Sequence, residues 1–296
     1  MIPPFRSGFV GVVGRPNVGK SSLVNTMVGA KVAIVSDKPQ TTRHIVRGAM
    51  SGEGHQAVFV DTPGFHKPRT ALGSRLNERV GDAVGSPVDV VLLVVDAASG
   101  VGRGDAFVAS REVAPFAGPK LCAVNKIDRF RGHDVVPQLE AAARLASFDH
   151  VVPTSARTGS GVDELRALIG GALPTGEPLF PFDVATDERL EIRIAEVVRE
   201  KALALTREEL PHSIAVVVDE IERDETLTRI SAVVYVERDS QKGIVIGKGG
   251  SMLKEIGTRA REELEAMLGT RVYLELRVKV MKEWQRDPRA LDRLGF

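Results

Sequence analysis

The sequence predicts an α/β domain with a mostly parallel sheet flanked by helices, followed by a smaller α+β domain. Up to residue 173, short β-rich runs alternate with longer amphipathic stretches, as a sheet with crossover helices requires. A glycine-rich segment, GRPNVGKS, lies between the first predicted strand and the first predicted helix. The later stretch PTGEPLFPFD carries three prolines, which prevent regular structure and indicate a stiff connector. We therefore place the domains at residues 1–173 and 183–296, with a linker at 174–182.

The first domain is predicted to contain six strands and five helices. Each strand is a short β-rich run, and each helix is a longer amphipathic stretch. The predicted strands are 9–13, 43–50, 56–60, 88–95, 120–124 and 150–153. The predicted helices are 20–28, 71–84, 104–116, 134–146 and 161–173.

The composition is that of an ordinary soluble, folded protein. The chain has 296 residues, of which 43% are hydrophobic and 27% charged, enough for two domains with separate cores. Its longest apolar run, residues 88–95, is much shorter than a bilayer span and is interrupted by Asp89. The N-terminus lacks the apolar core of a secretion signal, so a cytosolic protein is expected. The single cysteine, Cys122, excludes an intramolecular disulfide and favours a reducing compartment.

Beyond the linker, the order of the predicted elements changes. A helix at 187–206 leads into strands at 213–222 and 228–237, and a glycine-lysine loop and a second helix precede a closing strand at 271–280. Charge is distributed unevenly in this domain. Residues 183–240 hold 8 basic and 15 acidic side chains, whereas residues 241–296 hold 12 basic and 8 acidic ones. The net charge of +1 therefore hides a basic C-terminal part, which is either a solvated helix face or a surface for an anionic partner.

The glycine-rich segment fits a loop that holds the phosphates of a nucleotide. Its glycines let successive backbone N–H groups converge on phosphate oxygens, and the following helix presents its positive end to the same anion. Lys20 is expected to reach the β- and γ-phosphates, and the Ser21 hydroxyl is expected to ligate Mg²⁺. The predicted contacts are Gly14, Arg15, Pro16, Asn17, Val18, Gly19, Lys20, Ser21 and Ser22.

Three further motifs, each after a predicted strand, indicate that the base is guanine. In DTPG, Asp61 can hold Mg²⁺ through water, and the N–H of Gly64 can touch a γ-phosphate. In NKID, Asp128 can accept two parallel hydrogen bonds from guanine N1–H and the exocyclic amino group, an arrangement that adenine lacks. In TSA, the N–H of Ala156 can donate to guanine O6. The predicted contacts are Asp61, Thr62, Pro63, Gly64, Asn125, Lys126, Asp128, Ser155, Ala156 and Arg157.

With these motifs in this order, the first domain is similar to translation-factor-class GTPases. The segment PQTTR together with the second domain resembles the Era family, and the resemblance covers essentially the whole chain. It implies a P-loop GTPase domain in which a threonine before the second strand completes the Mg²⁺ shell in the GTP state, here Thr42, with Thr41 as the alternative. Ser21, Thr42 and Asp61 would then hold the Mg²⁺, the last through water. Loss of the γ-phosphate would release the switch loops.

Intrinsic hydrolysis is expected to be slow. The candidate catalytic residues Lys20, Thr42 and Gly64 act by positioning and charge stabilisation, and no general base is assigned. Phe65 stands where Ras-like enzymes have a glutamine that orients the attacking water, and its side chain cannot form that hydrogen bond. The replacement resembles the hydrophobic residue found across Era-like GTPases. Asn17 matches an asparagine that binds K⁺ in some of these relatives, which gives the hypothesis of stimulation by K⁺.

In the second domain, the loop GKGG fits the GXXG signature of a KH module, whose backbone passes close to about four nucleotides. The order helix, two strands, helix, GXXG, helix, strand resembles the type II KH domain of Era. Apolar residues would form the floor of a groove for single-stranded RNA, and basic side chains would contact phosphates. The only tyrosines and the only tryptophan of the sequence, Tyr235, Tyr273 and Trp284, are expected to pack and not to stack on bases. The predicted RNA contacts are Lys242, Ile244, Ile246, Gly247, Lys248, Gly249, Gly250, Lys254 and Arg259, with Val245 and Arg261 beside them.

The resemblance to Era implies a GTP-hydrolysing RNA-binding switch that binds small-subunit (16S) rRNA near its 3′ end and assists assembly of the 30S ribosomal subunit. The chain is expected to be a monomer in the cytoplasm. Weak peripheral association with the inner face of the cell membrane rests on the resemblance alone, because the sequence has no lipidation motif. Two alternatives are a signalling GTPase whose C-terminal domain binds protein, and a passive RNA chaperone whose nucleotide site is structural.

Overall fold

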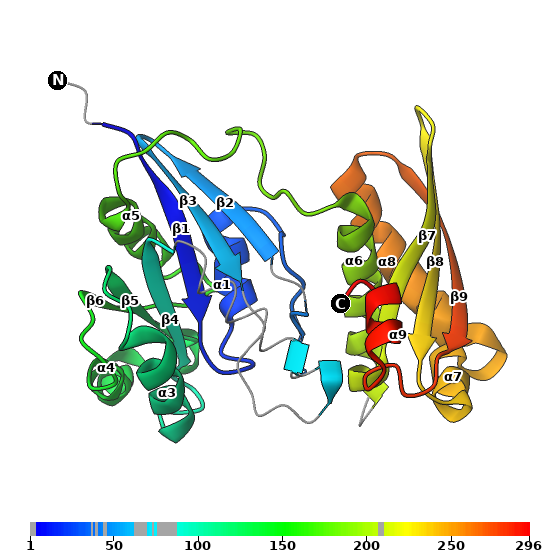
Figure 1. The fold of residues 1–296 in the computed structure, drawn as a ribbon, viewed down its shortest axis with the longest axis horizontal. Coiled ribbons are helices and arrows are strands. Elements are labelled where there is room, and N and C mark those ends of the chain that lie inside the picture. The colour runs from blue at the N-terminus through cyan, green and yellow to red at the C-terminus, as the bar shows by residue number, and fades with distance from the viewer. Residues whose placement is uncertain are drawn as a thin grey trace. The chain divides into compact units, whose positions relative to one another are not determined.

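The chain folds into two compact structural units (Figure 1). The first contains Met1–Val35, Thr42–Lys67 and Leu76–Asp187, and the rest of the chain belongs to the second. The computed structural model describes residues 4–36, 38, 41–43, 46–61, 70–72, 74, 75, 88–206 and 210–296.

The sheet of the first unit has, among the residues that the structure describes, six strands in the order β2-β3-β1-β4-β5-β6. All pairs are parallel except β2 with β3, which confirms the predicted mostly parallel sheet. Because parallel strands end at the same edge, the loops that follow β1, β5 and β6 meet there, beside the end of β3. The strands are β1 (Arg6–Val13), β2 (Val46–Gly52), β3 (His55–Asp61), β4 (Val90–Asp96), β5 (Lys120–Asn125) and β6 (His150–Pro153).

Helices cover both faces of this sheet. Alternate residues of β4 separate the two cores: Leu92 packs with α1 (Lys20–Val28) and α5 (Val162–Ala172), and Leu93 packs on the opposite face. All seven residues of β4 are buried, as expected for a parallel strand covered on both sides. The opposite face carries α3 (Arg103–Val108), a π-helical turn (Ala109–Val113) and α4 (Val136–Ala143).

Several element boundaries differ from the prediction. The helix predicted at 134–146 begins only at Val136, because a 3₁₀ turn (Gly132–Val135) precedes it and Pro137 occupies its first turn. The strand predicted from residue 43 runs from Val46 to Gly52. Of the helix predicted at 71–84, residues 71, 72, 74 and 75 are helical, and the others lie outside the described residues.

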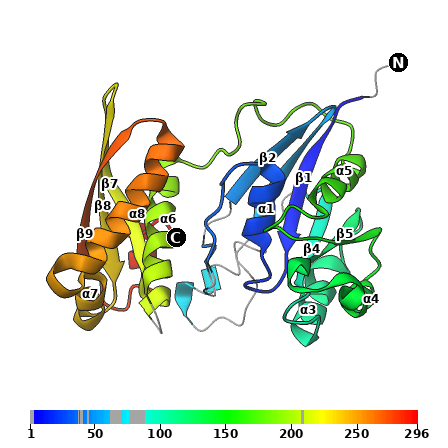
Figure 2. The same cartoon turned by 180° about the vertical axis from the view of Figure 1, so that it is seen from behind.

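The second unit has a three-stranded sheet in the order β7-β8-β9, with β7 antiparallel and β9 parallel to β8. Helices α6, α7 and α8 pack on one face of it (Figure 2), around core residues such as Val198, Val234 and Ile256. The element order agrees with the predicted α+β domain, and a short C-terminal helix, α9, was not predicted. The elements are α6 (Leu190–Leu205), β7 (Ala215–Arg223), β8 (Leu227–Val236), α7 (Asp239–Ile246), α8 (Ser251–Leu268), β9 (Arg271–Val280) and α9 (Pro288–Arg293).

Candidate functional site: a nucleotide pocket and a groove beside the GKGG loop

The loop between β1 and α1 curls tightly around the start of the helix. Gly19, the last residue before α1, has a φ of 98°, and a Cβ at this position would lie 2.4 Å from the side-chain amide of Asn125. A side chain is therefore excluded on both backbone and steric grounds. Because the first N–H groups of a helix lack intrahelical acceptors, α1 presents them together with its positive end to this loop.

Lys20 lies under the loop as a buried cation. Its Nζ donates to the carbonyl oxygens of Gly14 and Arg15, at 3.1 and 3.0 Å. Burial lowers the pKa of Lys20 to about 8, and the nearby charge of Asp61 opposes this shift. The amine is thus mostly protonated at neutral pH, and an anion placed against it would favour the charged form further.

Three oxygen-bearing side chains gather beside Lys20. The Ser21 hydroxyl donates to Asp61 Oδ2 at 2.6 Å and lies 3.0 Å from the Thr42 hydroxyl. Asp61 is fully buried, and its Oδ1 has no hydrogen-bond partner among the residues that the structure describes. Burial raises the pKa of Asp61, while Lys20 and the two hydroxyls oppose the shift. Two hydroxyls and a carboxylate with an unused buried oxygen fit a hard divalent cation such as Mg²⁺.

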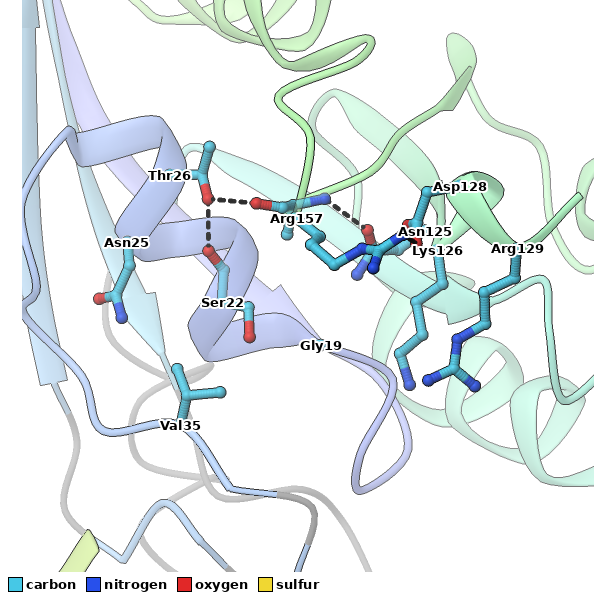
Figure 3. A pocket seen from close by; sticks show the side chains of 11 residues that line it. Gly19, Ser22, Asn25, Thr26, Val35, Asn125, Lys126, Asp128, Arg129 and Arg157 are labelled. Carbon is cyan, nitrogen blue, oxygen red and sulfur yellow. Dashed lines mark hydrogen bonds and ion pairs between the residues drawn. The ribbon is translucent and has the colours of Figure 1, made fainter. Parts of the chain in front are cut away.

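A pocket of about 520 Å³ lies between the start of α1 and the loops after β5 and β6 (Figure 3). Asn125 and Lys126 tie the NKID segment to the phosphate loop, because their side chains donate to Val18 O at 3.0 Å and Asn17 O at 2.6 Å. Lys126 also pairs with Asp96 at 2.7 Å. The base and phosphate sides of the site are therefore held together by direct hydrogen bonds.

Asp128 presents an ionised carboxylate to this pocket. Its Oδ1 accepts from the Ser155 hydroxyl at 2.6 Å, and its Oδ2 pairs with Arg157 at 2.8 Å. The Ser155 hydrogen bond, joined by the Arg157 charge, holds the pKa of Asp128 below its usual value, although burial opposes this shift. A carboxylate that stays ionised can accept the two donors on the Watson–Crick edge of guanine.

Two groups that were predicted to contact the nucleotide form hydrogen bonds or ion pairs within the protein. The N–H of Ala156, predicted to donate to guanine O6, donates to Asn125 Oδ1 at 3.1 Å. Arg15 turns from the phosphate loop to pair with buried Asp105 at 2.7 Å, which anchors the loop to the start of α3. Thr62, Pro63, Gly64 and Phe65 lie outside the described residues.

The pocket also has lining residues that sequence reasoning missed. Asn25 and Thr26 stand one turn beyond Ser22 on α1, a spacing that would have placed them on the same helix face. Asn25 Oδ1 accepts hydrogen bonds from the N–H groups of Val32 and Ala33, both at 2.9 Å. These bonds hold the segment that leads to Val35, which also lines the pocket and was not predicted. Arg129, directly after NKID, is the fourth missed residue.

In the second unit, a groove of about 610 Å³ runs between α8 and the edge strand β9. Gly249, in the GKGG loop that precedes α8, has a φ of 60°, and nothing lies within 4 Å of where its Cβ would be. The loop backbone can therefore be approached closely by a ligand. The residues lining the groove are Gly250, Leu253, Lys254, Gly257, Thr258, Arg261, Val272, Tyr273, Leu274 and Leu276.

The predicted RNA contacts are distributed unevenly around this groove. Lys248 is exposed in the loop and Lys254 lines the groove, whereas Arg259 pairs with Glu255 at 2.7 Å. Ile244 is 53% exposed on α7, whereas Val245 is buried in the core. The backbone of Ile246 ends α7 just before Gly247, and Lys242 lies on the same helix.

Tyr273, which was expected to pack, lies partly exposed at the surface of the second unit. This side chain is 55% exposed on β9, with the guanidinium of Arg229 at 5.8 Å from the ring centroid. Trp284 is buried, as expected, and its ring is stacked on Phe296. Leu253, Gly257, Thr258 and Tyr273 are groove residues that sequence reasoning missed as such.

Comparison with known proteins assigns both units. Residues 9–126 match a family described as "50S ribosome-binding GTPase", and residues 209–285 match the KH domain family. The chain is 50% identical over 298 residues to the GTPase Era of Mycobacterium bovis BCG Pasteur, covering 99% of both proteins. The chain belongs to the Era family of GTPases. The Era of Mycobacterium sp. KMS is 51% identical over 299 residues, again with 99% of each chain covered.

Solved Era structures agree with this assignment. The crystal structure of a variant of Aquifex aeolicus Era bound to GDP·AlF₄⁻ has a TM-score of 0.94 and 41% sequence identity, and the match covers 98% of this chain and 99% of that one. The same values hold for an Era crystallised with MgGDPNP and nucleotides 1506–1542 of 16S rRNA. The predicted Era resemblance and GTPase activity are thereby confirmed. Among the described residues, no helix is long and apolar enough to cross a bilayer.

Proposed function

We propose that this Era-family GTPase binds the 3′ region of small-subunit rRNA in the groove of its second unit, and that guanine nucleotide and Mg²⁺ in the first unit set the affinity. The observation that carries the proposal is the groove beside the GKGG loop, because a relative of matching fold over 98% of this chain was crystallised with the 16S rRNA 3′ segment. Assistance to 30S assembly follows from that choice of RNA.

In the nucleotide site, the proposed roles follow from position and charge. Lys20 neutralises the β- and γ-phosphates, and Asp128 reads the guanine edge. Ser21 and Thr42 bind Mg²⁺ directly and Asp61 binds it through water, which suits the unused buried oxygen of Asp61. When bound, Mg²⁺ neutralises charge that develops on the phosphates.

Hydrolysis in this proposal relies on placement and not on a strong base. The described site residues offer a buried cation at Lys20 and backbone N–H groups at the start of α1, both of which stabilise negative charge. Gly64 is the proposed γ-phosphate contact, and Phe65 cannot orient water, so the reaction is slow without an activator. Stimulation by K⁺ through Asn17 belongs to the same proposal.

In the second unit, the proposed ligand is single-stranded RNA. The groove has apolar walls from Leu253 and Leu276, and its rim carries Lys254 and Arg261, which suit bases and phosphates respectively. Lys248 adds a cation at the point where the loop backbone is most accessible. Cations beside an accessible loop backbone suit the phosphates of RNA, and this favours RNA over the protein partner that a signalling GTPase would bind.

Co-sedimentation with isolated ribosomal subunits tests this function. The full chain with a non-hydrolysable GTP analogue should co-sediment with 30S subunits and bind an RNA of the 16S 3′ end. It should bind a shuffled RNA of equal composition at least about tenfold more weakly, because base-edge hydrogen bonds would be left unmade. Association with 50S subunits alone, or equal affinity for both RNAs, would contradict the proposal. The chain is expected to act as a cytosolic monomer in these measurements.

A further inference from the structure

Two short stretches near the nucleotide-sensing residues belong to the second unit and not to the first. One is Ser36–Thr41, of which Ser36, Lys38 and Thr41 are described, and it directly precedes Thr42. The other is Pro68–Arg75, which begins four residues after Gly64 and is described at 70–72, 74 and 75. The segments that carry the proposed nucleotide contacts Thr42 and Gly64 are thus continuous in sequence with stretches that belong to the second unit.

The first stretch is held by Arg199, on α6. Its side chain is only 1% exposed, and its Nε and Nη2 donate to the two carboxylate oxygens of Glu196 at 2.7 and 2.6 Å. Nη2 also donates to the main-chain oxygen of Thr41. The planar guanidinium can make these bonds at the same time, because its N–H donors have fixed directions in one plane. A lysine ammonium is a compact point charge and could not bond to all of these partners at once.

This hydrogen bond acts on the position of Thr42. The carbonyl of Thr41 and the N–H and Cα of Thr42 belong to one rigid peptide plane, so holding the oxygen restrains the Cα from which the Thr42 side chain departs. The Thr42 hydroxyl in turn lies 3.0 Å from the hydroxyl of Ser21. Arg199 therefore restrains the backbone directly before a proposed Mg²⁺ ligand.

The second stretch is held in a similar way. Arg75 Nη1 donates to Asp292 Oδ1 and to the main-chain oxygen of Phe296, both at 2.7 Å. Leu72 is fully buried, and its N–H donates to the carbonyl of Gln285 at 2.9 Å. The C-terminal segment around α9 thus anchors the chain that follows the DTPG motif.

We propose that Arg199 is a positioning residue for GTP hydrolysis: through Thr41 it holds Thr42 in place for Mg²⁺, with Arg75 as the matching anchor for the segment after Gly64. The inference rests on the proposed function, since it makes the RNA-binding unit part of the apparatus that senses the γ-phosphate.

The test is single-turnover GTP hydrolysis by the full chain carrying Arg199→Lys, without RNA. This variant keeps a cation beside Glu196 but loses the planar set of N–H donors, so we expect hydrolysis at saturating GTP to fall about tenfold. The Mg²⁺ concentration needed for half-maximal rate should rise, while affinity for GDP stays within about twofold, because Thr42 acts only in the GTP state. Arg75→Gln should lower the rate in the same direction.

Two further variants separate positioning from loss of structure. Arg189→Lys makes the same chemical change at an exposed position on the edge of α6 and should leave hydrolysis unchanged. The double variant Glu196→Gln, Arg199→Gln removes both charges, so that no buried ion is left unpaired, and it should be as slow as Arg199→Lys.

Wild-type rate and Mg²⁺ dependence in folded Arg199→Lys would overturn the inference. Because these readouts need no RNA, they remain informative if wild-type protein fails to bind RNA, which would overturn the proposed function instead.

Discussion

Asp128→Asn is expected to lower the affinity for GTP and GDP by about three to four orders of magnitude. The carboxylate has two acceptor oxygens, held ionised by Ser155 and Arg157. An asparagine amide has one acceptor oxygen and one donor NH₂ group. Its NH₂ group would therefore face one of the two N–H donors of guanine, and neither donor would have an acceptor. Xanthine carries an oxygen in place of the amino group, and its nucleotides should bind the variant better than guanine nucleotides do.

Equilibrium binding of GDP and XDP to the wild type and the variant measures this change. Asp134→Asn is the matched control, because it makes the same substitution at an exposed position six residues further along the chain and should change neither affinity. Retention of guanine preference by Asp128→Asn would show that another group reads the base, and the assignment of the pocket would then be wrong.

Lys248→Glu is expected to weaken RNA binding by about tenfold or more and to make it less sensitive to salt. Lys248 is exposed in the loop between α7 and α8, where the backbone around Gly249 is open to close approach. Reversal of its charge replaces attraction to phosphate by repulsion without removing a buried contact. Affinity for GTP should be unaffected, since the nucleotide pocket is lined by other residues.

Titration of a labelled 16S 3′-end RNA at several salt concentrations measures this effect. Arg223→Glu is the charge-matched control: it lies at the end of β7, the edge strand on the other side of the sheet from β9, and should leave RNA affinity nearly unchanged. If Lys248→Glu lowers the affinities for RNA and GTP together, the division into two separate binding sites is wrong.

Much of the nucleotide site could be predicted because its motifs follow strand ends. In a parallel sheet the loops that follow the strands lie at one edge, so the positions of GRPNVGKS, NKID and TSA after predicted strands were enough to place Gly19, Asp128 and Ala156 around one pocket. The wall formed by Asn25, Thr26 and Val35 was missed. Helical spacing from Ser22 would have placed Asn25 and Thr26 on that face of α1, whereas no motif identifies Val35, because its place depends on how the segment after α1 folds back.

The groove of the second unit was harder to predict, because one of its walls comes from a strand whose position relative to the GKGG loop depends on the tertiary fold. The GKGG loop and the cations of α8 are local in sequence, whereas the facing wall comes from β9, whose parallel register with β8 cannot be read from either strand alone. Tyr273 alternates along β9 like the exposed Arg271 and Glu275, a period-2 pattern that marks it as outward-facing. The roles of individual residues in binding RNA stay predictions.

The measurement that most directly tests the coupling of the two sites is RNA affinity of the full chain in three nucleotide states. The same 16S 3′-end RNA is titrated with GDP, with a non-hydrolysable GTP analogue and without nucleotide. Differential affinity between the GDP and GTP-analogue states of about fivefold or more is predicted, the usual range for coupled sites. Identical affinities in all three states would contradict a nucleotide-controlled switch, even if both sites bind their ligands.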